Sequence, residues 1–190
     1  KEKLALIESF DQFNLLPDVQ SAIYTRALAG LNDVVPTPAQ KLAIPALLSR
    51  KGEHEKKKRN KVDDTPTYDQ FLIAAETGSG KTLAYLLPVI DAVKRQELVD
   101  EAEAEARKAR EEKEKAERKK RNAFEIDPPE LADSPHSTMG RPRAIILLPS
   151  SELIAQVSSV VKSLSHAIKY RSAPISSSHT PNRIRGHIYD

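Results

Sequence analysis

The residues AETGSGKT at positions 75–82 have the types and spacing needed to hold a phosphate group. Gly78 and Gly80 can adopt backbone angles that are closed to other residues, so successive N–H groups can point inward as a cradle for phosphate oxygens. Lys81 would contact the β- and γ-phosphates of a nucleotide, and the Thr82 hydroxyl would ligate Mg²⁺. This stretch therefore predicts a site for a nucleoside triphosphate and a magnesium ion.

The first position of this loop departs from the general pattern. That pattern, G-x-x-x-x-G-K-[ST], begins with glycine, whereas this chain has Ala75 there. The stretch is a damaged site, a chance match, or the variant of one particular family. Its flanks favour a working site, because FLIAA at 71–75 is typical of a strand buried on both faces. Residues 81–96 then have helical periodicity, with a kink expected at Pro88.

A second strand and helix follow further along the chain. The apolar run RAIILLP, residues 143–149, has the same buried-strand pattern. Residues 151–166 return to helical spacing, and Ser150 or Ser151 with Glu152 supplies the chemistry of a helix start. The order strand, loop, helix, strand, helix predicts an α/β fold with a parallel sheet flanked by helices.

Each of the other segments has either a helical pattern or a very high content of charged residues. Residues 1–50 read as a compact helical region, in which Thr37 is an N-cap and Pro38 takes the first helical position. Residues 51–69 have almost no apolar content and read as a charged insertion. Their basic run KKKRNK either contacts a phosphate backbone or is simply a solvated loop. Residues 96–141 read as a second, longer insertion.

The longer insertion has two parts. Residues 97–121 are rich in Ala, Glu, Lys and Arg, which favours an exposed single helix braced by ion pairs of about 0.3 kcal/mol each. Residues 122–141 are rich in proline, and we expect them to be disordered. We expect removal of residues 100–138 to leave nucleotide binding intact. After 142–166, residues 167–190 form a polar tail.

Composition narrows the classes of protein. The chain of 190 residues has no cysteine, which excludes disulfides and thiolate metal sites. No run of eighteen apolar residues occurs, so the sequence predicts no membrane span. The net charge of +3 and the isoelectric point near 9.0 permit a nucleic-acid partner without requiring one.

Three stretches together resemble the first half of a DEAD-box RNA helicase. FDQFNLLPDVQSAI with VVPTPAQKLAIP is similar to the Q motif of that family, AETGSGKT to its phosphate loop A-x-T-G-x-G-K-T, and LLPSSELIAQ to its motif P-T-R-E-L-A-x-Q. The family itself has alanine at the first loop position, so Ala75 is no defect. The resemblance implies that residues 1–190 form an incomplete N-terminal RecA-like P-loop NTPase domain.

The resemblance also implies a role for each matching residue. Gln40 would hydrogen-bond the adenine edge, and Phe10 would pack near the base, although each has the plain alternative of a surface helix or core position. Pro149, Ser150 and Ser151 would lie against an RNA backbone. Lys81 and Thr82 would be catalytic, with Thr82 also the Mg²⁺ ligand. The implied ATP-binding set is Phe10, Thr37, Gln40, Ala75, Glu76, Thr77, Gly78, Ser79, Gly80, Lys81 and Thr82.

Several features differ from the family pattern. Leu31 lies where many members have an aromatic residue that stacks on adenine, and Ser151 replaces an arginine. The D-E-A-D stretch, the S-A-T stretch and a second RecA-like domain with its arginine finger do not occur in these residues. The 97–121 run either contacts RNA or a ribosomal surface, or is a solvated helix.

Two functions of different classes follow. The first is the ATP-binding half of an ATP-dependent RNA helicase that remodels RNA. The resemblance is greatest to fungal mitochondrial DEAD-box helicases of large-ribosomal-subunit assembly. It implies ATP and Mg²⁺ as cofactors, ribosomal RNA and mitochondrial large-subunit precursors as partners, a monomer, and a mitochondrial location. The second is a non-catalytic nucleotide- or RNA-binding fragment, or an assembly contact. A different P-loop ATPase is a third reading, which the Gln40 element argues against.

Overall fold

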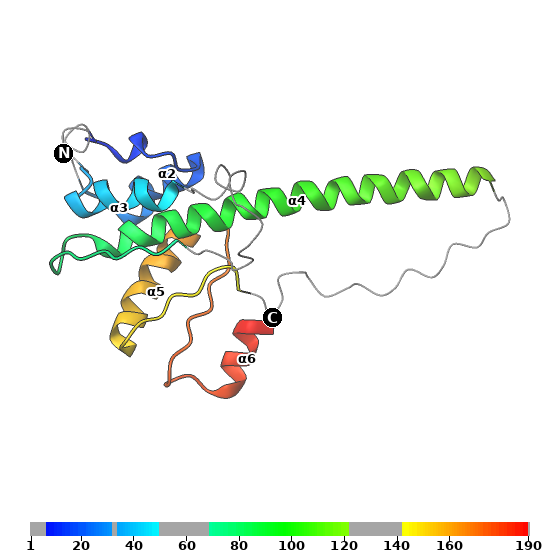
Figure 1. The fold of residues 1–190 in the computed structure, drawn as a ribbon. Helices are drawn as coiled ribbons and strands as arrows, with labels where there is room; N and C mark the ends of the chain where they lie inside the picture. Colours follow the sequence, from blue (N-terminus) through cyan, green and yellow to red (C-terminus); the bar gives the residue numbers. More distant parts are fainter. Residues whose placement is uncertain (1–6, 32–33, 50–68, 122–141, 190) are drawn as a thin grey trace, which may run out of the picture.

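The computed structural model describes residues 7–31, 34–49, 69–121 and 142–189 (Figure 1). Seven helical elements follow one another in these ranges. They are the 3₁₀ turn η1 (Phe10–Gln12), α2 (Pro17–Ala22), the π-helical turn η2 (Ile23–Ala27), α3 (Pro38–Leu48), α4 (Lys81–Arg121), α5 (Ser151–Ser165) and α6 (Pro181–Tyr189). The charged insertion at 51–69, apart from Asp69, and the proline-rich stretch 122–141 lie outside the described residues.

The expected parallel sheet is not present among the described residues, which contain no β-strand. The segments predicted as buried strands are extended but exposed, with Leu72 96% and Leu147 89% accessible. A strand needs neighbours on both sides to pair its backbone N–H and C=O groups and to cover its faces. Neither 71–75 nor 143–149 has such a neighbour among the described residues, so the apolar pattern alone did not produce burial.

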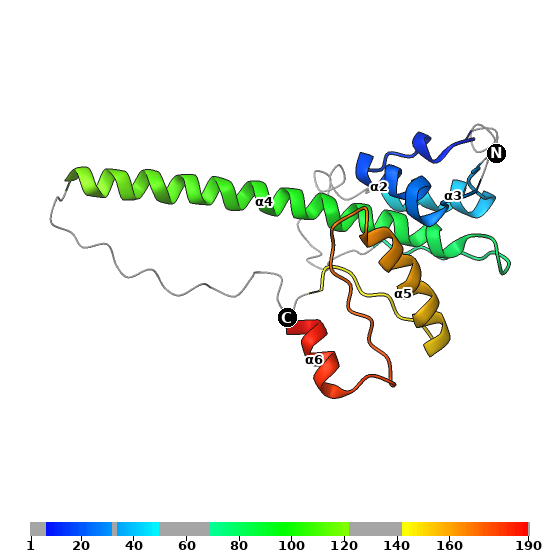
Figure 2. The same ribbon diagram turned by 180° about the vertical axis from the view of Figure 1, so that it is seen from behind.

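Helix α4 is the central element of the structure. It runs for 41 residues without a break, through Pro88 and on through the predicted 97–121 helix. Its second half extends away from the rest of the molecule in both views (Figures 1 and 2). From Glu101 to Glu117 nearly every side chain is exposed, including those of the Arg107–Glu111 pair at 3.7 Å. The helix predicted at 97–121 is therefore confirmed, as a direct continuation of the helix that begins at the phosphate loop.

The hydrophobic core lies where α2, α3, the first half of α4 and α5 meet. Helix α3 packs along α4, and α5 packs against η2. α3 continues through Pro45, as α4 does through Pro88, so both prolines lie inside unbroken helices. The buried cluster consists of Phe10, Phe13, Leu15, Val19, Ala22, Ile23, Ile44, Leu87, Ile90, Leu164 and Ile168.

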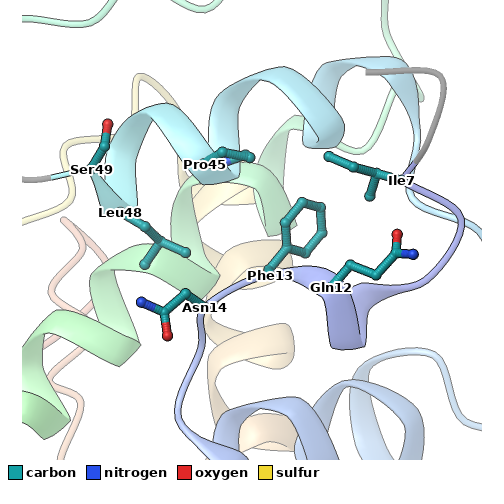
Figure 3. A pocket seen from close by; sticks show the side chains of 7 residues that line it. All are labelled: Ile7, Gln12, Phe13, Asn14, Pro45, Leu48 and Ser49. Carbon is teal, nitrogen blue, oxygen red and sulfur yellow. The ribbon is translucent and has the colours of Figure 1, made fainter. Parts of the chain in front are cut away.

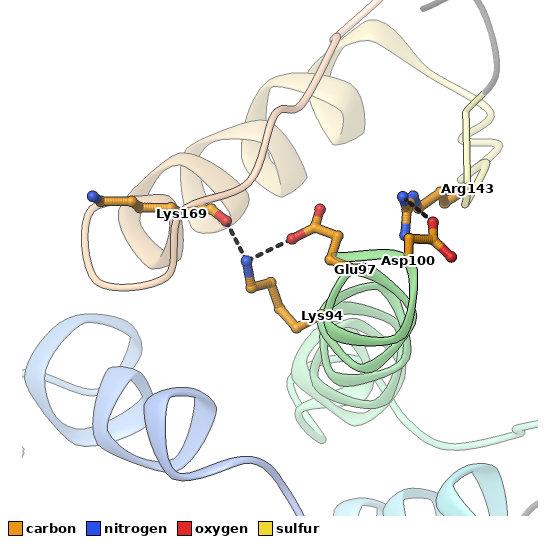
Figure 4. Close-up of polar contacts among 5 residues, drawn as sticks. All are labelled: Lys94, Glu97, Asp100, Arg143 and Lys169. Atoms are coloured by element: carbon orange, nitrogen blue, oxygen red, sulfur yellow. Dashed lines mark hydrogen bonds and ion pairs between the residues drawn. The ribbon is translucent and has the colours of Figure 1, made fainter. Parts of the chain in front are cut away.

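Two polar contacts attach later segments to the middle of α4 (Figure 4). Lys94 Nζ donates to Lys169 O at 2.8 Å and pairs with Glu97 at 2.6 Å. Arg143 Nη2 pairs with Asp100 Oδ2 at 2.6 Å. These contacts hold the start of the 142–149 segment and the turn after α5 beside α4. Asp100, whose side chain is 43% exposed, thus contacts a residue that follows the predicted insertion at 96–141.

Candidate nucleotide-binding site

The two glycines of the loop before α4 have the backbone angles predicted for them. Gly78 and Gly80 both have positive φ, +81° and +78°, the region in which glycine is strongly preferred. The Ser79 N–H donates to Glu76 O at 3.2 Å, which closes the turn, and α4 begins at Lys81. The loop therefore ends at a helix N-terminus, where backbone N–H groups and the helix dipole favour an anion.

The N-cap of α3 and a residue in its first turn touch this loop directly. Thr37 Oγ1 donates to Ser79 O at 2.7 Å, and Gln40 Nε2 donates to Gly80 O at 3.2 Å. Thr37 and Gln40 also form a capping box, in which Gln40 N–H donates to Thr37 Oγ1 and Thr37 N–H donates to Gln40 Oε1. Thr37 is confirmed as the predicted N-cap, and the spacing T-x-x-Q is the sequence signal for the part that Gln40 adds.

The same hydrogen bonds hold the Gln40 carboxamide at a buried position. Gln40 is only 4% exposed, and both ends of its amide have a backbone partner. A β-carbon added at Gly80 would lie 2.5 Å from Gln40 Nε2, so the close approach requires glycine at that position. The role of Gln40 toward adenine stays a prediction. What the structure shows is Gln40 as the link between the start of α3 and the end of the loop.

The Lys81 side chain lies against the start of the loop that precedes α4. Its Nζ donates to Ala75 O at 2.7 Å and to Glu76 O at 2.5 Å. These carbonyls give the ammonium group hydrogen-bond acceptors of the kind that phosphate oxygens also offer. The loop itself is exposed from Ala75 to Gly78, so a ligand can reach it from solvent.

The donor set fits a triphosphate. One ammonium group, a helix N-terminus and a loop with two positive-φ glycines all favour a multiply charged anion. The buried Ser79 Oγ has no hydrogen-bond partner among the described residues. No group of three or more His, Cys, Asp or Glu able to hold a metal occurs in the described ranges.

Tyr85 lies next to Thr82, the predicted Mg²⁺ ligand, and was not among the residues predicted from the sequence. It lies one turn after Thr82 on α4, so the two side chains share a face of the helix. Burial raises the pKa of the Tyr85 phenol, and a hydrogen bond with the Thr82 side chain works in the opposite direction. A hydroxyl that ligates Mg²⁺ through a lone pair still has its proton to donate, and Tyr85 is an acceptor within reach of Thr82. The i, i+3 spacing T-x-x-Y was the available signal.

Phe10 lies inside the core. Its ring makes edge contacts with Phe13 and Tyr24, with centroids 5.8 and 6.4 Å apart. Leu31, at the position of the expected adenine-stacking aromatic, is 63% exposed. The structure thus places Thr37 and Gln40 against the loop but holds Phe10 within a separate aromatic cluster.

A cavity of about 370 Å³ lies beside that cluster, at the end of α3 away from Gln40 (Figure 3). Phe13 and Leu48 supply apolar walls, and the amides of Gln12 and Asn14 lie at its rim. The lining residues are Ile7, Gln12, Phe13, Asn14, Pro45, Leu48 and Ser49.

The residues expected to contact RNA begin another helix. Ser150 is the N-cap of α5, and its hydroxyl accepts from Leu153 N–H at 3.3 Å. Pro149 and Ser151 flank it and are exposed. The pKa of Glu152 is lowered by a hydrogen bond from its own backbone N–H and by those from the Ser150 and Ser151 hydroxyls. The carboxylate is ionised at neutral pH and supports the helix start, and the RNA role stays a prediction.

A comparison with known protein families shows which family has a sequence like that of this chain. A family profile described as DEAD/DEAH box helicase matches residues 37–188, a range that begins at the N-cap of α3 and includes the loop. The chain belongs to the DEAD/DEAH box helicase family. Membership implies a RecA-like fold, although its parallel sheet is not present among the described residues.

Individual relatives in this family match over the full length of the chain. Proteins named ATP-dependent RNA helicase mrh4, mitochondrial, are 58% identical over 189 residues in Aspergillus clavatus and 56% identical over 189 residues in Aspergillus fumigatus. A protein of the same name in Ajellomyces capsulatus is 47% identical over 197 residues. The chain covers 29%, 29% and 32% of the lengths of these three relatives. No solved structure matches.

None of the helices in the described residues is long and apolar enough to cross a membrane.

Proposed function

We propose that this chain is the ATP-binding part of a mitochondrial ATP-dependent RNA helicase. The observation that supports this most is the pair of bonds by which Thr37 and Gln40 hold the phosphate loop, at 2.7 and 3.2 Å. The general P-loop pattern, G-x-x-x-x-G-K-[ST], includes no such carboxamide. The names of the relatives, which include RNA and the mitochondrion, agree with the proposal.

The residues present account for binding more fully than for turnover. Backbone N–H groups at the start of α4 and the Lys81 ammonium would hold the phosphates, while Thr82 would hold Mg²⁺. Bound Mg²⁺ would neutralise charge on the β- and γ-phosphates. Gln40 would hydrogen-bond the purine edge through its second N–H and the second lone pair of its oxygen, since its first donor and acceptor bond Gly80 O and the Thr37 N–H. Phe10 would support the base from the aromatic cluster.

RNA binding belongs to the same proposal. Pro149, Ser150 and Ser151 are accessible to an RNA backbone at the exposed start of α5. Contacts of this kind recognise phosphate and sugar, so we expect affinity to depend on salt and RNA shape more than on base sequence. Ribosomal RNA and precursors of the mitochondrial large subunit are the proposed targets, and the protein would act as a monomer.

Nucleotide choice tests the proposal. We expect the chain to bind Mg–ATP more tightly than Mg–GTP, measured by calorimetry, and Gln40→Ala to lose that preference. Gln40→Glu is the matched variant, because it retains the acceptor for the Thr37 N–H but removes the donor to Gly80 O. Equal affinity of the unmodified chain for ATP and GTP would count against the helicase assignment.

A measurement of ATP hydrolysis distinguishes the proposed helicase from its alternative. RNA-stimulated ATPase should be absent from these 190 residues and present when the region that follows in the longer relatives is added. A longer chain that still shows no turnover would favour the alternative, a non-catalytic nucleotide- or RNA-binding module. The exposed second half of α4 is the surface on which such a module would make an assembly contact.

A further inference from the structure

Asp91 is a buried carboxylate that the phosphate loop does not use. It lies on α4 and is only 1% exposed. Its Oδ1 accepts from the backbone N–H of Leu16 at 2.7 Å, and its Oδ2 accepts from Arg95 Nε at 2.6 Å. Arg95 Nη2 in turn donates to Asn14 O at 3.0 Å. Two side chains one turn apart on α4 thus hold two backbone groups that are 75 and 81 residues away in sequence.

Stability alone does not account for a carboxylate here. Desolvating a carboxylate is costly, and an ion pair at a buried position stabilises a fold no more than well-packed apolar side chains do. The neighbours of Asp91 on α4, Leu87 and Ile90, show that this face of the helix packs against the core. The charged pair specifies a geometry that apolar side chains would not, because its directional hydrogen bonds define one position for the 14–16 backbone.

The segment held in this way carries the aromatic cluster. Phe13 precedes Asn14 directly, and its ring packs edge-on against Phe10, the residue assigned to the purine in the proposed function. Phe13 and Asn14 also line the cavity against the C-terminal half of α3 (Figure 3). The Asp91 contacts therefore fix one wall of the region between the aromatic cluster and α3.

Helix α4 connects this wall to the phosphate loop. Its first turn carries Lys81, and Asp91 follows ten residues later, or about 15 Å along the helix axis. Gln40 anchors α3 at the loop end, and Asp91 with Arg95 anchors the 14–16 segment further along. A rigid helix between two anchors sets the spacing between the loop proposed to bind phosphate and the segment that carries the aromatic cluster.

We propose that Asp91, with Arg95, is a positioning residue for the purine end of the nucleotide site. The proposal rests on the proposed ATP binding and deepens it. Asp91 touches no nucleotide. It sets where the Phe10–Asn14 wall lies relative to the phosphate loop, so its loss should affect the adenosine part of the ligand and spare the phosphates.

The test compares Mg–ATP with Mg–tripolyphosphate, which has the phosphates and no base. Calorimetry on the whole chain gives both dissociation constants for the unmodified protein and for Asp91→Ala. We expect Asp91→Ala to weaken ATP about tenfold and tripolyphosphate less than about twofold. Asp91→Asn retains an acceptor for the Leu16 N–H, so it should recover part of the ATP affinity. Asp100→Ala is the control, because its carboxylate pairs with Arg143 away from this wall.

Each possible result of this experiment either supports or contradicts the positioning role of Asp91. Equal weakening of ATP and tripolyphosphate in Asp91→Ala, or no weakening of either, overturns the positioning role while the ATP site stands. An unmodified chain that binds ATP no better than tripolyphosphate overturns both this role and the proposed function. Should Asp91→Ala fail to fold, Asp91→Asn and Arg95→Lys answer the same question, since Arg95→Lys retains the charge and removes the arm that reaches Asn14 O.

Discussion

Gln40 and Gly80 approach so closely that no β-carbon fits between them. Gln40 Nε2 lies 3.2 Å from Gly80 O, and a β-carbon on Gly80 would lie 2.5 Å from the same nitrogen. Because the obstructing atom is the end of a flexible side chain, an added methyl group would displace the carboxamide rather than the backbone. Glycine at position 80 therefore serves the contact with α3 as well as the turn of the loop.

This relationship predicts different costs at the two loop glycines. Gly78→Ala meets no atom within 4 Å and has only the strain of positive φ, about 1–2 kcal/mol. Gly80→Ala has similar strain and also breaks the bonds of Gln40, so we expect about 1 kcal/mol more loss of unfolding free energy in urea. In a Gln40→Ala background the two glycine substitutions should cost the same. Equal costs in the unmodified background would contradict the argument.

The two hydrogen bonds of the Thr37 hydroxyl lead to a second prediction about the free energy of unfolding. Thr37→Val removes both the cap of Gln40 N–H and the donation to Ser79 O, with little change in shape, and should cost about 1–2 kcal/mol. Thr25→Val is the matched control, since the Thr25 hydroxyl donates only to Ser21 O in an adjacent turn and is exposed. Urea unfolding of both variants measures the difference. A Thr37→Val variant as stable as the control would show that the α3–loop contact contributes little.

Tyr170 predicts a pH dependence of stability. Burial raises the pKa of its phenol from an ordinary value near 10 to about 12, and its hydroxyl donates to Val161 O. A folded-state pKa above the unfolded one means that this stabilisation is complete below pH 10 and is lost as pH rises toward 12. Tyr170→Phe should therefore show a smaller decrease in melting temperature across that window. Unfolding curves at pH 9, 10 and 11 would test it, and parallel decreases in both proteins would exclude the assignment.

The contacts at the middle of α4 predict where the helix can be shortened. Asp100 pairs with Arg143, so a deletion of 100–138 removes this ion pair as well as solvated helix. We expect deletion of 102–138 to leave the melting temperature and ATP affinity unchanged. Deletion of 97–138 also removes Glu97 and should cost about 1 kcal/mol. If the shorter deletion is as harmful as the longer one, the exposed half of α4 has a structural role that these contacts do not explain.

Local chemistry made some features predictable from the sequence. Gly78 and Gly80 are the residues that positive φ favours, and Thr37 before Pro38 is a helix start because its hydroxyl caps the first turn. The charged run to Arg121 is helical for a similar local reason, since its residues have high helix propensity and opposite charges at i, i+4. Each of these rests on atoms a few residues apart.

Tertiary structure decided the rest. The sequence by itself determined the phosphate loop, the start of α3 and the charged helix, but it did not show that Gln40 bonds Gly80 or that Asp91 holds Leu16. The apolar runs at 71–75 and 143–149 met strand criteria and yet lie exposed, with Leu72 and Leu147 in solvent. The physical reason is the same in each case. Burial and long-range hydrogen bonds depend on which partner the whole fold brings to a residue, and a run of side chains does not specify that partner.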